Sequence, residues 1–78
     1  MVELNRAVAV AEVEGPEAAL SIVDALALDE YQYLHSTRAD LLRRLGRPGE
    51  ARAAYQRALT LAPAGPERRF LERQLALL

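Results

Sequence analysis

The sequence of 78 residues contains no cysteine, no tryptophan and no lysine, and it has a single histidine, His35. Without cysteine, neither a disulfide bond nor a thiolate metal site can form. A single histidine excludes a metal site built from several imidazoles. Ser36 is adjacent to His35, and adjacent residues of a helix do not face each other as a nucleophile and its base must. We therefore expect no enzymatic activity, no metal and no cofactor.

Long apolar runs are also missing, and none approaches the roughly 20 residues that a membrane-spanning helix needs. The first residues, MVELNRAVAV, have neither the basic start nor the cleavage site of a signal peptide. We therefore expect a cytoplasmic protein that makes no use of a membrane. The absence of lysine beside ten arginines, in a chain rich in alanine, suggests a bacterial genome rich in GC.

Alanine and leucine dominate the hydrophobic residues, and β-branched residues are few, which favours helix throughout. Proline opens a helix at no cost in hydrogen bonds, and it follows Gly15, Arg47 and Gly65. Asp29 is expected to cap the third helix, with Gln32 in capping-box register. We predict five helices, at residues 2–14, 16–28, 30–45, 48–62 and 66–77. Because the connections are short, neighbouring helices should be antiparallel.

The second half of the chain has the residue spacing of a tetratricopeptide repeat (TPR), a helix–turn–helix unit of about 34 residues. The repeat has small residues where its two helices touch, a glycine at the turn, an aromatic residue beside the contact and a closing proline. The matching residues here are Ala39, Gly46, Ala51, Tyr55, Ala58 and Pro63. Proteins built from such repeats bind other proteins and seldom catalyse reactions.

A weaker copy of the pattern lies 32 residues upstream, where Ala7 aligns with Ala39 and Val23 with Tyr55. We therefore predict a single all-α domain, residues 1–78, built as a TPR-like right-handed stack of two antiparallel helical hairpins with a C-terminal capping helix. Residues 1–29 form the degenerate repeat, 30–63 the clear repeat and 64–78 the cap.

The two ends of the stack differ in their apolar patterns. The capping helix has an apolar face of Phe70, Leu71, Leu75 and Leu78 and a charged face opposite, as the last helix of a solenoid should. The first helix has apolar residues, including Leu4 and Val8, with no upstream neighbour to cover them. We therefore expect the chain to be a fragment excised from a larger protein, or a chain whose first face is covered by another domain.

Charge is unevenly distributed along the sequence. Residues 1–30 hold seven acidic residues against one arginine, a net of −6, and residues 31–78 hold nine arginines against four acidic residues, a net of +5. These charges are either solvated helix faces or a surface that orients a partner. Arg6 and Arg38 occupy positions that are usually apolar in TPRs, so each must pair with a nearby carboxylate or contact a ligand.

Partner binding in TPRs uses the first helix of each repeat. In the TPR register this surface comprises Tyr33, Ser36, Asp40, Arg43 and Arg44 of the second repeat and Leu4, Val8, Ala11 and Glu12 of the first. We take Leu4, Val8, Tyr33, Ser36, Asp40, Arg43 and Arg44 as candidate partner-binding residues. The lysine, asparagine and arginine of the chaperone-tail clamp are not at their positions, which disfavours a chaperone C-terminus as the ligand.

Nucleic acid is a second class of ligand to weigh. An arginine stripe is present in the second half of the chain, formed by Arg43, Arg44, Arg47, Arg52 and Arg57. Asp40, Glu50 and the acidic first half oppose it, and no aromatic residues that could stack on bases alternate with these arginines. We therefore expect a protein partner and no direct binding of DNA or RNA.

Five stretches carry a more specific resemblance: LNRAVAVAE, GPEAAL, RADLLRRLGR, A-x-x-AY-x-RAL-x-LAP and PERRFLERQL. Together they resemble the C-terminal TPR-like extension of one group of extracytoplasmic-function RNA polymerase sigma factors. The resemblance covers essentially the whole chain. It implies a non-catalytic regulatory domain that controls transcription initiation through contacts with the sigma domains of its own chain or with RNA polymerase. The alternative is a generic TPR adaptor or scaffold that binds a peptide or protein partner.

Overall fold

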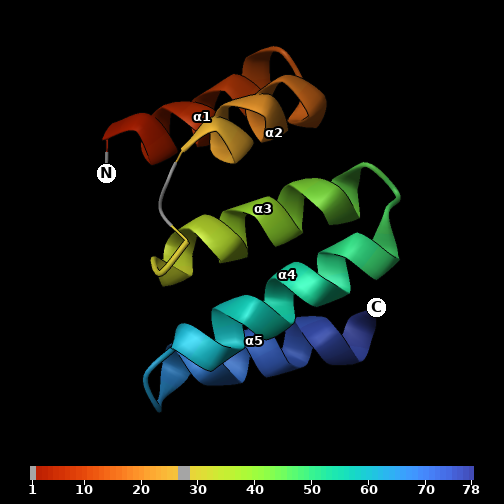
Figure 1. The fold of residues 1–78 in the computed structure, drawn as a ribbon. Coiled ribbons are helices and arrows are strands. Elements are labelled where there is room, and N and C mark those ends of the chain that lie inside the picture. Colours follow the sequence, from red (N-terminus) through yellow and green to blue (C-terminus); the bar gives the residue numbers. More distant parts are fainter. Residues whose placement is uncertain (1, 27–28) are drawn as a thin grey trace.

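The computed structural model describes the backbone of residues 2–26 and 29–78 and the side chains of residues 4–26 and 29–78. These residues form five helices, α1 (Val2–Val13), α2 (Pro16–Ala25), α3 (Gln32–Arg44), α4 (Pro48–Leu61) and α5 (Pro66–Leu77) (Figure 1). The described part of the chain contains no strand, which confirms the all-α prediction. The end expected for α2 includes residues 27 and 28, which lie outside the described residues.

Helix starts follow the expected chemistry in three cases and depart from it in one. Proline occupies the first turn of α2, α4 and α5. The predicted Asp29 cap of α3 is wrong, because Tyr31 takes the capping position and no side chain caps the helix. The Gln32 amide is instead directed to Glu67 of α5, 2.9 Å away. The Asp29 carbonyl lies 2.7 Å from His35 Nε2. In place of the capping box, Gln32 therefore contacts Glu67 of α5, and Asp29 contacts His35 through its backbone.

The connection between α3 and α4 has a specific backbone device. Gly46 adopts a φ of 71°, which an L side chain rarely allows. Its N–H donates to the carbonyl of Arg43, and the N–H of Arg47 donates to that of Leu42, both at 3.0 Å. This pair of bonds is a Schellman motif, which satisfies two carbonyls at the end of α3 and ends the helix. The chain then turns back so that α4 packs antiparallel to α3.

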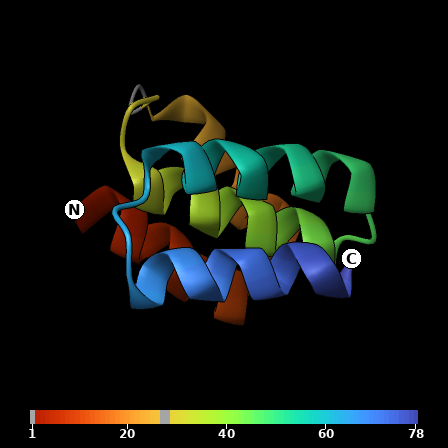
Figure 2. The same ribbon diagram turned by 90° about the horizontal axis from the view of Figure 1, so that it is seen from below.

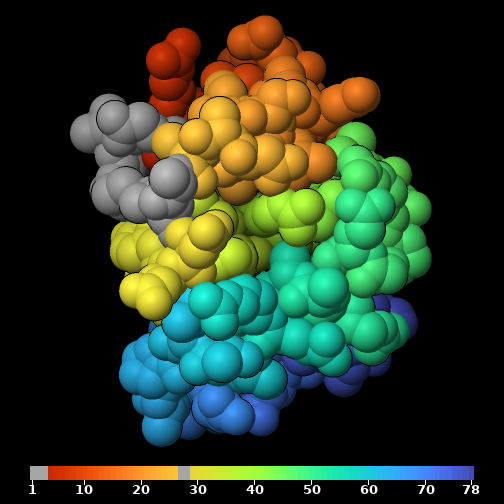
Figure 3. All heavy atoms as spheres, viewed as in Figure 1, coloured from red at the N-terminus to blue at the C-terminus, as the bar shows by residue number. Residues whose placement is uncertain are grey.

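The helices stack in chain order, each packed against the next, and α1 also contacts α3. Seen along the stack, α2 and α4 lie on one side, whereas α1, α3 and α5 form the other side (Figure 2). On the first side, α3 is visible between α2 and α4 in the space-filling view (Figure 3). We call the opposite side the inner face, because it carries the first helix of each hairpin.

The core of the second hairpin follows the TPR spacing. Ala39, Ala51 and Ala58 are 0% exposed, and Tyr55 is 1% exposed between them. Alanine lets the backbones of α3 and α4 approach closely, and the tyrosine ring fills the space that remains beside them. Burial also raises the pKa of Tyr55, so its phenol stays neutral at ordinary pH. These residues lie in the core, as predicted from the sequence.

The first hairpin and the cap continue the same register. Ala7, Ala19 and Val23 are fully buried, and so is Leu71, which lies 32 positions after Ala39. Phe70 does not belong to this core, as it was expected to, because its side chain is 48% exposed. Adjacent residues of a helix point about 100° apart, so a fully buried Leu71 directs Phe70 to the flank of α5.

Candidate functional site

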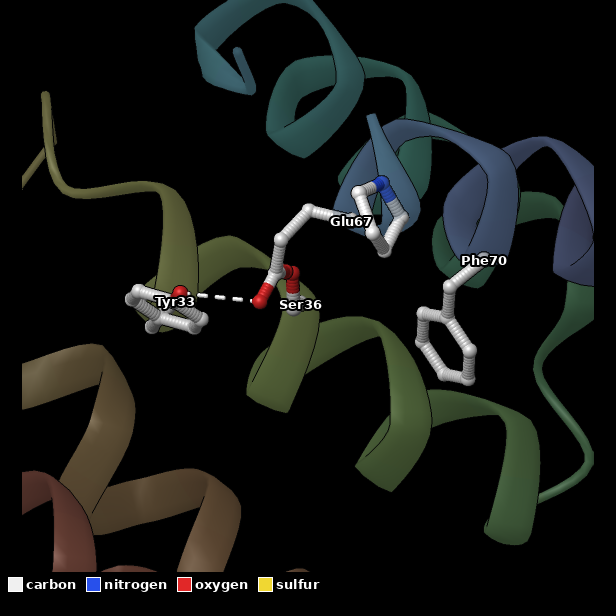
Figure 4. A pocket seen from close by; sticks show the side chains of 5 residues that line it. Tyr33, Ser36, Glu67 and Phe70 are labelled. Carbon is white, nitrogen blue, oxygen red and sulfur yellow. Dashed lines mark hydrogen bonds between the residues drawn. The ribbon is translucent and has the colours of Figure 1, made fainter. Parts of the chain in front are cut away.

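A depression on the inner face lies between α3 and α5 (Figure 4). It has a volume of about 330 Å³, and its lining residues are Tyr33, Ser36, Pro66, Glu67 and Phe70. The first two come from α3 and the other three from the first turns of α5. The capping helix therefore supplies half of the site in addition to covering the last hairpin.

Glu67 links the two helices that form the depression. Its Oε2 accepts a hydrogen bond from Gln32 Nε2 at 2.9 Å, and its Oε1 accepts one from the Tyr33 hydroxyl at 2.8 Å. The hydrogen bonds from Gln32 and Tyr33 lower the pKa of Glu67, and the bond to Glu67 raises the pKa of Tyr33. At neutral pH the site therefore holds a fixed carboxylate beside a neutral phenol.

Two aromatic side chains flank the depression, with a small residue between them. Tyr33 is 45% and Phe70 is 48% exposed, so both rings present apolar surface to solvent. The Ser36 hydroxyl donates to the Gln32 carbonyl at 3.3 Å, within its own helix, so this small side chain is already satisfied. Figure 4 shows Ser36 between the two rings. This arrangement suits a ligand that has an apolar side chain beside a hydrogen-bond donor. Glu67 would accept the hydrogen bond from that donor.

The three charged candidates on α3 form one cluster, in which both arginines pair with Asp40. Asp40 accepts a bond from Arg43 Nη2 at 2.5 Å and contacts Arg44 Nε at 3.0 Å. Arg44 also lies 3.5 Å from Glu12 of α1. The hydrogen bond to Asp40 raises the pKa of Arg43. All three side chains remain 37–46% exposed, so they form a paired charged cluster at the far end of α3 from Tyr33.

The two candidate partner-binding residues on α1, Leu4 and Val8, differ in exposure. Leu4 is only 5% exposed and belongs to the core, so the expectation that it lines the partner-binding surface is wrong. Ala11, expected beside it, is 7% exposed and buried as well. The contact of α1 with α2 and α3 turns these side chains inward. Val8 is 48% exposed and stays on the surface. The open apolar face expected on α1 is therefore much smaller than its sequence indicated.

Two polar residues of α3, His35 and Arg38, lie beside α2. Arg38 Nε donates to Asp24 Oδ1 at 2.8 Å, which joins α3 to α2. His35 is half-buried, and Leu34 is the buried residue beside it. Both polar side chains border a second cavity of about 240 Å³ between α2 and α3. The pair of Arg38 with Asp24 thus joins the basic second part of the sequence to the acidic first part within the molecule.

Sequence reasoning missed the contribution of α5 to the site, namely Pro66, Glu67 and Phe70. A signal was present in the offset of 32 that relates Ala7 to Ala39, since one more step reaches Leu71. That register places Leu71 in the core and therefore Phe70 beside it on the flank. The hydrogen bonds of Glu67 had no comparable signal, because they depend on how α5 sits against α3.

Comparisons with known proteins agree with the second hairpin. The tetratricopeptide repeat family model matches residues 32–64, which comprise α3, the turn and α4. An uncharacterised protein of Rhizobium meliloti (strain 1021) is 49% identical over 77 residues. That match covers 96% of this chain but only 18% of the relative, so the chain spans about a fifth of the relative's length. No solved structure matches the chain.

The membrane question has a direct answer for the residues described. None of the helices formed by residues 2–26 and 29–78 is both long enough and apolar enough to cross a bilayer.

The TPR match places the α3 half of the depression inside the repeat and the α5 half after it. The chain thus has an all-α, TPR-like fold, with a tetratricopeptide repeat at residues 32–64 and a candidate binding surface shared between that repeat and the helix that follows it.

Proposed function

We propose that this chain is a non-catalytic protein-interaction module that docks a protein segment on its inner face. The observation that carries the proposal is the pair of half-exposed aromatic side chains, Tyr33 and Phe70, on either side of a depression of about 330 Å³. Aromatic residues are enriched at the centres of protein interfaces, where they provide large contact areas at a small entropic cost. The TPR repeat at residues 32–64 supports the same class of function.

The length of the relative bears on where the partner comes from. The chain aligns with only 18% of that protein, so we infer that the module works inside a longer polypeptide. A binding surface covalently joined to its partner has a high effective concentration, so a modest contact is sufficient. A docking partner within the same polypeptide is therefore our first expectation, and a separate protein is the second.

The finer form of the proposal is the regulatory C-terminal domain of an extracytoplasmic-function sigma factor, acting in the cytoplasm on its own sigma domains or on RNA polymerase. Its support is the whole-chain resemblance of five stretches, from LNRAVAVAE at residues 4–12 to PERRFLERQL at residues 66–75. The generic adaptor role needs only the repeat and its surface, and it is the broader claim. The complete open reading frame tests the finer form, because sigma domains must then precede this chain.

The docking claim is tested with the full-length protein. Tyr33→Ala combined with Phe70→Ala removes both aromatic walls and should expose the backbone amides of α3 and α5 that the partner covers. Hydrogen exchange of the full-length protein measures this loss of protection. Val13→Ala is the matched control, since Val13 is 83% exposed and does not line the depression.

Val13→Ala should keep the thermal stability of the wild type, and the double variant should stay folded but melt somewhat lower, because Tyr33→Ala also removes the hydrogen bond to Glu67. For the finer form, the double variant should also change transcription from a dependent promoter. If it stays folded and exchanges like the wild type, and a Val8→Asp variant does so too, the inner face is not the docking surface.

A further inference from the structure

We propose that the groove between α3 and α5 selects a bipolar amphipathic segment, with apolar anchors between a basic residue at one end and an acidic residue at the other. The basic residue lies at Glu67, and the acidic residue lies toward Arg73 and Arg43. This inference rests on the proposed function and deepens it, because it states the chemistry of the segment and which end of the groove each charge occupies.

The groove has a defined direction because α3 and α5 run the same way (Figure 2). The two helices meet at their starts, where the Tyr33 hydroxyl bonds Glu67. Ten residues farther along, α3 reaches Arg43 and α5 reaches Leu77. At about 1.5 Å per residue, both positions lie about 15 Å from the Tyr33–Glu67 contact. The depression, at Tyr33 and Glu67, is therefore one end of the surface that α3 and α5 share, and Arg43 and Leu77 mark its other end. We call this surface the groove.

An apolar stripe follows this direction along α5. Phe70 and Leu77 are seven residues apart, which is two helical turns, so they share one flank about 10 Å apart. They are 48% and 74% exposed, and Tyr33 extends the stripe across to α3. Apolar anchors at matching spacing on an amphipathic segment would cover all three side chains. This is the way an amphipathic helix occupies a groove between helices.

The first end of the groove is negative. Glu67 is the only charged residue among those that line the depression. Each of its oxygens accepts one hydrogen bond, from Gln32 or Tyr33, while an ionised carboxylate has about four acceptor positions. Capacity therefore remains for a lysine or arginine of the ligand. Arg68 follows Glu67 in the sequence but donates to the Leu59 carbonyl at 3.3 Å, on the α4 side.

The other end of the groove is positive. On α3, Asp40 is shared by two arginines, Arg43 and Arg44. On α5, the exposed Arg73 lies three residues after Phe70 and four before Leu77, so it shares their side of the helix. Arg73 makes no ion pair with the side chains of residues 4–26 and 29–78. An acidic residue of the ligand has an available partner there.

The helix macrodipoles act in the opposite sense, with roughly half a positive charge at each helix start and half a negative charge at each end. These partial charges belong to backbone groups at the helix termini, which point along the helix axes. At the end of α3, the carbonyls of Leu42 and Arg43 already accept hydrogen bonds from Arg47 and Gly46. The side-chain charges belong to groups that border the groove, where the ligand lies. The side chains therefore decide the sign of the potential that a bound segment meets.

The test uses four labelled, alanine-rich peptides, each with two leucines two helical turns apart. They differ only in the two residues that flank the leucines: lysine and glutamate, two lysines, two glutamates, or two glutamines. Fluorescence anisotropy measures binding to the 78-residue chain. Partly exposed charge pairs are worth enough to make the mixed-charge peptide about two- to fivefold tighter than the glutamine peptide. Amide chemical shifts should then move at Tyr33, Ser36 and Phe70.

Matched variants assign each charge to its end of the groove. Glu67→Gln should weaken the mixed and lysine peptides but not the glutamate peptide, and Arg73→Gln should weaken the mixed and glutamate peptides. Arg52→Gln, at an exposed position of α4, should change the affinity of none of the peptides. Equal affinities for the mixed and glutamine peptides would overturn the charge selection and leave the docking function standing. Shifts confined to α2 and α4, or no binding of any peptide, would overturn the groove assignment. The docking function itself is contradicted only if the full-length protein with Tyr33→Ala and Phe70→Ala also shows the hydrogen exchange of the wild type.

Discussion

The two hairpins make the same close helix contact but fill the space beside it differently. Both have a fully buried alanine on each helix, Ala7 and Ala19 in the first hairpin and Ala39 and Ala51 in the second. Beside this contact the second hairpin places Tyr55, and the first places Val23. The family model matches only the second hairpin, at residues 32–64. Small residues at the contact are thus enough to build a hairpin that has lost the aromatic part of the motif.

The largest expected difference concerns those two filling residues. Tyr55→Ala should lower the free energy of unfolding by about 3–5 kcal/mol, because it removes a fully buried ring and leaves a cavity. Val23→Ala removes two methyl groups and should cost about 2 kcal/mol. Urea unfolding measures both. If Tyr55→Ala does not fold, Tyr55→Leu takes its place, and equal losses in the two hairpins would contradict the comparison.

Overpacking tests whether the two alanine contacts are equally tight. Ala39→Leu adds volume at a site with no exposed surface and should cost about 1–3 kcal/mol, and Ala7→Leu should cost a similar amount. Ala53→Leu, at an exposed position of α4, is the control and should change stability by less than about 0.5 kcal/mol. A harmless Ala7→Leu would mean that the first hairpin is packed more loosely than the second.

The link between the second hairpin and the cap should depend on pH. The folded pKa of Glu67 is lowered by its bonds to Gln32 and Tyr33, so its stabilising effect is present above the ordinary value of 4.5 and is lost as pH falls through the folded pKa. Glu67→Gln should therefore melt below the wild type at neutral pH, and the gap should narrow below pH 4.5.

Thermal melts at several pH values measure this gap. Glu17→Gln, at an exposed position of α2 in the other hairpin, is the control variant. A gap between the wild type and Glu67→Gln that stays constant through the acid range would show that the carboxylate does not hold the cap.

The smallest effect is expected where the hairpins meet. Arg38 and Asp24 form a 2.8 Å pair between α3 and α2, with side chains 32% and 50% exposed. A double-mutant cycle with Arg38→Gln and Asp24→Asn should give a coupling of about 0.2–1 kcal/mol, because exposed pairs are weakened by water and salt. The coupling should shrink in high salt. A value near zero would leave apolar contacts and the 3.5 Å pair of Arg44 with Glu12 to join the two hairpins.

The helices and the core were predictable from the sequence because both depend on local spacing. The alanines, Tyr55 and the prolines at helix starts are placed by periodicities within one hairpin. The Asp29 cap failed because Gln32 found a partner 35 residues away, on α5. Contacts of that kind depend on the angle at which separate helices pack, which spacing along the chain does not contain.

The candidate site was predictable only in its α3 half. Tyr33 and Ser36 lie where the TPR register puts them, on the surface beside a depression. Leu4 was misplaced because the register gives a residue's direction on its own helix but not how deeply that helix sinks against its neighbours. Glu67 and Phe70 were not predicted as site residues, because the apolar spacing of α5 indicates its contact with α4 but not its contact with α3.

The order of helix contacts has a consequence for how the molecule opens. Apart from α1 with α3, and the Glu67 bonds between α5 and α3, each helix packs mainly on its neighbours in the chain. In such a one-dimensional stack, an end helix can detach without disturbing the far end. We expect hydrogen exchange to be slowest in α3 and α4 and to quicken toward both ends. On the α5 side, detachment would dismantle the groove, so a ligand that spans α3 and α5 would also slow the exchange of α5.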